Sequence, residues 1–140
     1  MKILLAVDGS KSSERAARHV VQLARQLAQP PRLTVLNVDL PLLKAAAAKM
    51  GTRAVAEYHA SNADHALRHV RAVLSRAKLE FVAQTVIGEP APAIAKAAEA
   101  CDADLVVMGS RGMTALKNLL LGSVASKVLA TSSVPVTLVR

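Results

Sequence analysis

Five short runs rich in valine, leucine and isoleucine divide this chain, and segments with helical spacing separate them. Most of the runs are continuously apolar, which is typical of strands buried on both faces of a parallel sheet. No hairpin signal joins consecutive runs, so each connection is expected to be a right-handed crossover. The pattern predicts an α/β, doubly wound, mainly parallel five-stranded sheet with helices on both faces. The expected strands are residues 3–7, 33–38, 81–87, 104–109 and 134–139.

Helical spacing places apolar side chains every three or four positions in four of the intervening segments. The first segment starts after serines that can cap a helix, and two prolines follow its end. The third starts with prolines, which the first turn of a helix tolerates. For residues 40–53 the spacing leaves both a loop and a short extra helix open. The four expected helices are residues 11–29, 54–78, 89–100 and 123–131.

A chain of 140 residues is expected to form one domain, residues 1–140, with a substantial buried core. The apolar content of 52% comes mainly from alanine, valine and leucine and argues against disorder. The one cysteine, Cys101, cannot form an internal disulfide, which favours a reducing compartment. No apolar run has the length of a secretory signal or a bilayer span. We therefore expect a cytoplasmic protein with no membrane partner.

The net charge of +8 raises the question of nucleic-acid binding, because clustered lysine and arginine neutralise phosphates. Here the basic residues are dispersed among apolar residues at helical spacing, as is typical of solvated helix faces. The aromatic residues, Tyr58 and Phe81, offer no platform for stacking bases. We therefore do not expect nucleic acid to be a partner.

Gly109, Gly112 and Gly122 interrupt a stretch that is otherwise apolar and compatible with a helix. Glycine inside an element costs about 0.5–1 kcal/mol relative to alanine, so its presence suggests unusual backbone dihedral angles or the close approach of another group. The first two follow the fourth expected strand, and Gly122 precedes the last expected helix. Ligands bind at the carboxyl ends of parallel strands, and helix N-termini attract anions. We therefore expect a phosphate group there, although the Walker A and G-x-G-x-x-G motifs are absent.

The segment GSRG, followed after nine residues by GS, resembles the G-x-x-G-x9-G-[S/T] signature of the nucleotide-binding branch of the universal stress protein family. The opening KILLAVDGSKSSERAARHVVQLA, the middle VIGEPAPAIAKAAEACDADLVVMGSRG and the final LLLGSVASKVLATSSVPVTLVR are also similar to that family. Residues 40–60 lack the likeness. The resemblance implies a Rossmann-like sheet of order 3-2-1-4-5, with ATP across the ends of the first and fourth strands.

Residue by residue, the resemblance implies a set of contacts to ATP. Asp8 would reach the ribose or a phosphate-bound metal ion, and the backbone of Val38 would meet the adenine. Arg111 and its neighbouring glycines would hold the ribose and phosphates, and the start of the last helix would bind the phosphates. Whether Mg2+ accompanies the phosphates is left open. The implied binding residues are Ala6, Val7, Asp8, Val38, Met108, Gly109, Arg111, Gly112, Gly122, Ser123 and Val124.

Other chemistry has weaker support in the sequence. His65 and His69 have the H-x3-H spacing of zinc ligands, but a solvated helix face explains them better. A triad of Ser123, a histidine and Asp8 is disfavoured, because all four histidines are expected on helices away from the strand ends and no G-x-S-x-G motif is present. The scarcity of aromatic residues disfavours a flavin. We therefore assign no catalytic and no metal-ligating residues.

Three functions remain open at this point. The first is an ATP-binding sensor or regulator, whose role in the stress response comes from the family resemblance. The second is a slow ATPase or an autophosphorylating protein with Ser123 or Ser126 as acceptor, although no base that would orient water is identified. The third is a structural dimerisation module without nucleotide, against which the intact glycines argue.

The final run, residues 134–140, would be an edge strand in the implied order, with free backbone groups on its outer side. We expect a homodimer in which two copies of this strand pair antiparallel around a two-fold axis, with Val136 and Leu138 in contact. An edge protected by Pro135 and Arg140 is the alternative.

Overall fold

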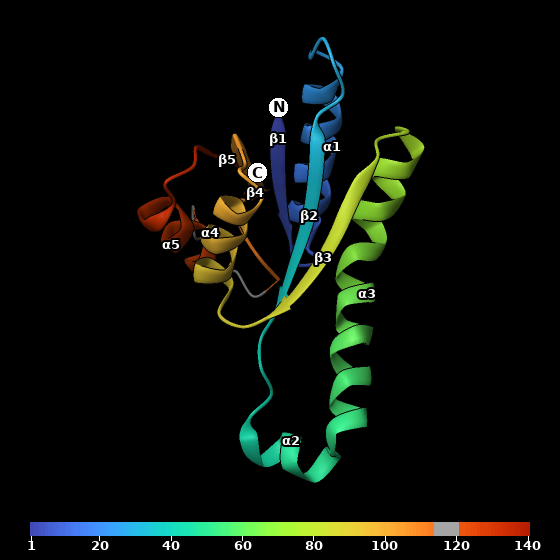
Figure 1. The fold of residues 1–140 in the computed structure, drawn as a ribbon, viewed down its shortest axis with the longest axis vertical. Helices are drawn as coiled ribbons and strands as arrows, with labels where there is room; N and C mark the ends of the chain where they lie inside the picture. Colours follow the sequence, from blue (N-terminus) through green and yellow to red (C-terminus); the bar gives the residue numbers. More distant parts are fainter. Residues whose placement is uncertain (114–120) are drawn as a thin grey trace.

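The computed structural model describes residues 1–113 and 121–140 and contains a five-stranded sheet in which every neighbouring pair of strands is parallel (Figure 1). The strand order is β3-β2-β1-β4-β5, so the predicted fold class and order are confirmed. In the register, β1 ends opposite Asn37, and β2 continues for two residues alongside β3. The strands are β1 (Lys2–Val7), β2 (Arg32–Asp39), β3 (Phe81–Ile87), β4 (Leu105–Gly109) and β5 (Val136–Val139).

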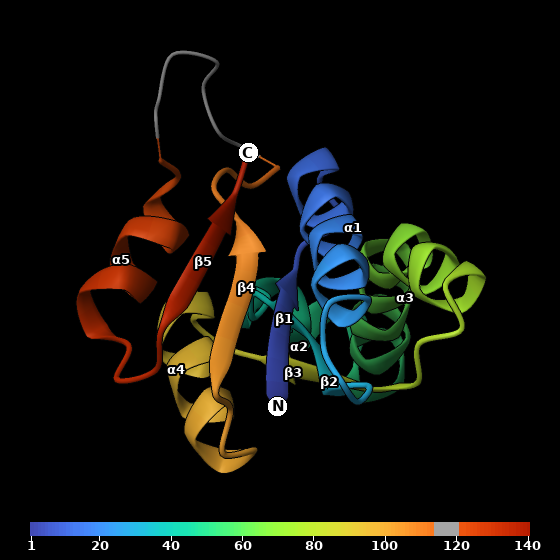
Figure 2. The ribbon, with the colours of Figure 1, turned by 90° about the horizontal axis from the view of Figure 1, so that it is seen from above.

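Helices cover the two faces of the sheet in two layers (Figure 2). On one face, α1 and α3 bury an aliphatic cluster against the strands, and on the other α4 and α5 bury a second cluster. The second cluster also includes the half-buried Cys101, beside the carboxyl end of α4. Burial of these aliphatic side chains is the main stabilising contribution to the fold. The helices are α1 (Lys11–Ala24), α2 (Lys44–Met50), α3 (Thr52–Arg76), α4 (Pro90–Ala100) and α5 (Ser123–Thr131).

Residues 40–53, for which the sequence left both a loop and a short helix open, contain the short helix α2, and none of the residues of α2 is buried. Gly51, with a φ of 80°, separates α2 from α3, and this left-handed conformation suits glycine. Figure 1 shows α2 and the first half of α3 extending beyond the end of the sheet. Residues 44–58 therefore lie largely outside the two packed layers.

Two expectations about the elements are wrong. The first helix ends at Ala24 rather than at residue 29, because the chain turns back toward β2 and the residues that follow face solvent or are only half-buried. β3 is not buried on both faces: every residue after Phe81 in this strand is exposed. β3 lies at the edge of the sheet, where α3 covers it only in part. Its apolar residues after Phe81 are therefore exposed, although such a composition is typical of buried strands.

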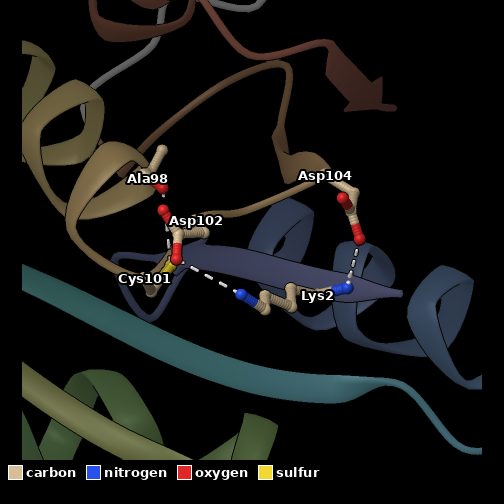
Figure 3. A network of polar contacts seen from close by, with 5 residues as sticks. All are labelled: Lys2, Ala98, Cys101, Asp102 and Asp104. Carbon is tan, nitrogen blue, oxygen red and sulfur yellow. Dashed lines mark hydrogen bonds and ion pairs between the residues drawn. The ribbon is translucent and has the colours of Figure 1, made fainter.

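Polar contacts join the amino end of β1 to the loop before β4 (Figure 3). The Lys2 backbone N–H donates to Asp104 over 2.7 Å, and the Lys2 ammonium lies 3.3 Å from the Asp102 carboxylate. Asp102 has a φ of 46°, a left-handed conformation that aspartate tolerates better than most residues. These contacts fix the turn at the end of the sheet opposite the carboxyl ends of the strands.

Candidate functional site

A cavity of about 530 Å³ opens at the carboxyl ends of β1, β2 and β4. The first turns of α4 and α5 and the residues after β4 complete its walls. Cavities of this size hold small-molecule ligands. A wider hollow of about 830 Å³ lies at the amino ends of β1, β2 and β3, but no glycine and no helix N-terminus contributes to its described lining.

All of the residues that the resemblance implied for nucleotide binding lie in the lining of the cavity at the carboxyl ends. The structure thus brings together residues from β1, β2, β4 and α5 that are far apart in the sequence. Eight residues of the described lining were not predicted from the sequence. One of them, Leu36, could have been, because side chains alternate along β2 and Leu36 shares a face with Val38. The other seven required the three-dimensional structure. The lining residues that sequence reasoning missed are Ser13, Leu36, Asp39, Leu40, Pro90, Ile94, Met113 and Ala125.

Asp8, which directly follows β1, joins α1 to the segment after β4. Its Oδ1 accepts hydrogen bonds from the Ser10 N–H over 3.0 Å and from the Ser13 hydroxyl over 2.6 Å. Its Oδ2 accepts from the Met113 N–H over 3.0 Å. Ser10 is also the N-cap of α1, where its hydroxyl accepts from the Ser13 N–H. Asp8 therefore fixes the shape of the cavity floor in addition to facing the cavity.

Gly109 and Gly112 allow two close approaches between chain segments. A Cβ added at Gly109 would lie 2.6 Å from the Ser12 Cβ and 2.9 Å from the Ser12 carbonyl carbon. One added at Gly112 would lie 2.8 Å from the Asp8 Oδ2. Neither glycine has a positive φ, so the dihedral explanation is wrong for both. Glycine is needed here because α1 and the Asp8 carboxylate come too close for a side chain.

Gly122 differs from these two glycines. It is the N-cap of α5, with a φ of −75° that any residue adopts, so dihedral strain does not explain it either. A Cβ there would lie 3.4 Å or more from its nearest described neighbours, which is ordinary contact. Its N–H donates to the Ser110 carbonyl over 2.8 Å and is therefore not available to a ligand. Nothing within the described residues requires glycine at this position.

Within the described residues, the amino end of α5 presents unpaired donors to the cavity. The N–H groups of Ser123, Val124 and Ala125 are in the first turn and have no acceptor within the helix. No side chain among the described residues caps this end, and all three residues line the cavity. The helix dipole adds a partial positive charge at the same place. The arrangement is suited to binding an anion.

At the end of β2, α3 holds the side chain of Asp39. Its Oδ2 lies 2.6 Å from the Nδ1 of His59 and 3.0 Å from the Nδ2 of Asn62. Burial raises the pKa of Asp39, but the hydrogen bonds from His59 and Asn62 outweigh burial and hold that pKa below its ordinary value. The expectation that every histidine lies away from the strand ends is therefore wrong for His59. This pairing joins residues 20 apart in the sequence, and no sequence pattern signals it.

The other candidate histidines lie outside the cavity. His65 and His69 are on the exposed face of α3, where the His65 ring contacts the Arg68 guanidinium over 3.1 Å. Within residues 1–113 and 121–140, no three His, Cys, Asp or Glu side chains are grouped so as to hold a metal ion. In the same residues, no helix combines the length and apolar character needed to cross a membrane.

Comparison with known proteins gives matches over the whole chain. Residues 1–140 match the model of the universal stress protein family. The universal stress protein YxiE of Bacillus subtilis is 33% identical, and the match covers 99% of this chain and 98% of that protein. A universal stress protein of Thermus aquaticus is 36% identical over 99% of this chain and 97% of its own length.

Solved structures with the same fold include two that are at least 25% identical. The structure of protein MJ0577 superposes with a TM-score of 0.83 and 28% identity, covering 99% of this chain and 94% of that one. A universal stress protein in complex with cAMP superposes with a TM-score of 0.72 and 25% identity, covering 100% of this chain and 97% of that one.

Proposed function

The chain belongs to the universal stress protein family, and we propose that it is a nucleotide-binding member that takes up ATP and acts as a sensor or regulator in the stress response. Gly122 carries this proposal. It is a glycine that neither its dihedral angles nor its described neighbours require, and it stands at the cavity beside uncapped helix N–H groups. A phosphate group close to its Cα supplies the missing reason for glycine.

The cavity lining divides by chemistry into two ends. Its glycines, Arg111 and the first turn of α5 lie on the β4 side and suit phosphates. The apolar side chains of Leu36, Val38 and Ile94 lie between β2 and α4 and suit a planar base. A nucleotide lying from β2 to α5 satisfies both ends. The cAMP complex of a family member supports an adenine nucleotide as the class of ligand.

Mg2+ would be held through the phosphates rather than by a protein carboxylate. Three hydrogen bonds from the protein leave about one acceptor position on the Asp8 carboxylate, enough for a ribose hydroxyl, and Asp39 lies at the apolar end of the cavity. Mg2+ commonly keeps several waters and binds phosphate oxygens of the substrate. The roles proposed for Asp8 are therefore contact with the ribose and support of the residues after β4.

Two measurements test the proposed function. Protein purified from cells and then denatured should release an adenine nucleotide, which chromatography identifies. Titration of nucleotide-free protein with ATP in a calorimeter should give saturable binding with one site per chain. A folded protein that neither releases a nucleotide nor binds ATP would contradict the proposal.

The enzymatic alternative makes a distinct prediction about turnover. The charged residues of the described lining are Asp8, Asp39 and Arg111; Asp8 accepts three hydrogen bonds from the protein, and α3 holds Asp39 at the apolar end, so neither carboxylate is placed as a base for water at the phosphate end. We therefore expect steady-state ATP hydrolysis several orders of magnitude below the median enzyme rate of about 10 per second. Phosphate release assays check this rate, and turnover near the median would favour an enzyme. Ser123, which lines the cavity, is the acceptor to examine by mass spectrometry for autophosphorylation.

We also propose that the protein forms a homodimer through β5, which lies at the edge of the sheet. The Pro135 carbonyl accepts a hydrogen bond from the Val106 N–H of β4, and the Val139 carbonyl accepts one from the Ser110 N–H just after β4. The residues that alternate with these two, including Leu138, therefore direct their backbone groups away from β4. Val136 and Leu138 pack half-buried against the core of their own chain. Pairing between two copies would therefore depend chiefly on backbone hydrogen bonds.

Replacing Leu138 by proline should convert the dimer into a folded monomer. Proline removes an N–H that points away from β4, so the internal hydrogen bonds between β4 and β5 are kept. Leu138→Ala is the matched control, because it shortens the same side chain and retains the N–H. Sedimentation should show a dimer for the parent and the alanine variant. A monomeric parent at micromolar concentration would exclude this assembly.

A further inference from the structure

The end of β2 is open toward the cavity at the apolar end, where the proposed function places the base. β1 ends opposite Asn37, and among the described residues no strand pairs with Val38 and Asp39 on that side. Both residues line the cavity, and Asp39 is the charged residue of the lining that belongs to this end. Its side chain is 18% exposed. Val38 faces α4 and Asp39 faces α3, and both line the cavity because it opens beyond the end of β2, so a base seated on Val38 and Ile94 would present its polar edge past the strand end toward Asp39.

The side chain of Asp39 is held in place rather than mobile. His59 and Asn62 both approach Oδ2, and the backbone N–H of Leu40 also favours the ionised carboxylate. A carboxylate has about four acceptor positions on its two oxygens, and the His59 and Asn62 donors both use Oδ2, so acceptor positions remain on Oδ1. The direction of Oδ1 is fixed as well, since two side chains from α3 hold the carboxylate through Oδ2. His59, nearly buried, adds rigidity to this arrangement.

We propose that Asp39 is a specificity-determining residue that accepts a hydrogen bond from the 6-amino group of the adenine base, and that His59 and Asn62 are the positioning residues that hold it. This inference rests on the proposed nucleotide binding. The 6-amino group of adenine is a donor, whereas the oxygen at the same position of guanine or hypoxanthine is an acceptor. A carboxylate attracts the donor and repels the acceptor. An acceptor held in advance also reduces the ordering that binding requires.

Comparing two ligands in each variant tests the contact directly. ATP and purine riboside 5′-triphosphate differ only in the 6-amino group, so the ratio of their affinities measures what that group contributes. A hydrogen bond to a charged group is expected to change this ratio by about tenfold or more. In Asp39→Ala the preference for ATP should fall by that factor, measured by calorimetry. Because the ratio is internal to each variant, partial unfolding leaves it unchanged.

The positioning role needs a separate readout. His59→Ala should lower the preference for ATP, and His59→Asn should restore much of it, because the asparagine amide places a donor close to that of Nδ1. Asp64→Ala is the matched control, since Asp64 is an exposed aspartate of α3 that pairs with Arg71. Its ratio should equal that of the parent.

The outcomes separate the two proposals. A preference for ATP that is the same in the parent, Asp39→Ala and Asp64→Ala would overturn the role of Asp39 while leaving nucleotide binding intact. A parent that binds neither triphosphate would reject the proposed function, and the role of Asp39 with it. A lowered preference in the His59→Ala variant without rescue in His59→Asn would remove the positioning role and keep the contact by Asp39.

Discussion

Valine at position 122 is expected to abolish ATP binding and to leave the protein folded. The backbone of Gly122 already has dihedral angles that valine prefers, and the added Cβ meets its described neighbours at ordinary contact distances. The added Cβ faces the backbone of residues 110–112, and the γ carbons beyond it would fill space between that backbone and the start of α5, where the phosphates are placed. We expect affinity to fall at least about 100-fold, or about 2.7 kcal/mol, as measured by calorimetry.

Two further variants make the Gly122→Val result specific. Gly88→Val changes a glycine whose added Cβ has no heavy atom of the described residues within 4 Å, its chain neighbours aside, and which is not in the described lining of the cavity, so ATP affinity should be unchanged. Gly122→Ser introduces a good N-cap for α5, which should keep or raise stability while it lowers affinity. Parental ATP affinity in a folded Gly122→Val protein would refute the placement of the phosphates.

Valine at position 109 should have the opposite effect, a large loss of stability. The added Cβ would lie 2.6 Å from the Ser12 Cβ and 2.9 Å from backbone of α1, and neither atom can move without displacing the helix. Forcing extra atoms into a packed interior costs about 1–3 kcal/mol, and we expect the upper end because the obstruction is backbone. Urea unfolding measures this change as a lower midpoint.

The same Gly88→Val variant serves as the control for Gly109→Val, because it adds equal volume where space is open. Its unfolding midpoint should stay close to that of the parent. If Gly109→Val were as stable as Gly88→Val, the close packing of α1 against the end of β4 would not limit this position. The reason for glycine at 109 would then have to be sought in the ligand, as at 122.

The fold could be predicted from the sequence because its signals are local or repeated. Continuous apolar runs and helical spacing identified the strands and most of the helices, and a family likeness supplied the strand order. β3 shows where this reasoning fails. Its run of valine and isoleucine resembles that of an inner strand, yet its exposure depends on its place at the edge of the sheet. Position in the sheet is a property of the topology, which composition does not encode.

The candidate site was predictable to a different extent for each class of residue. Gly109, Gly112 and Gly122 stand out because glycine is unexpected in an apolar stretch that is compatible with a helix. Asp8 stands out because a carboxylate directly follows an apolar strand. Asp39 and His59 do not, since each is an ordinary polar residue in its own segment. Their relation arises only when α3 packs beside the end of β2. Gly109 and Gly112 are needed because chain segments approach each other closely there, and not because of their dihedral angles. The sequence shows neither property directly, so it could not decide between the two explanations.

Helix α2 offers a practical point of attachment for experiments on this protein. None of its residues is buried, so a dye or an affinity tag on an α2 side chain such as Ala48 disturbs neither layer of the core. Leu40 lines the cavity, and three residues separate it from the start of α2 at Lys44. No residue of α2 is part of the described lining, so the attachment point itself lies outside the cavity. The overhanging helix thus provides a place from which ligand entry can be followed optically.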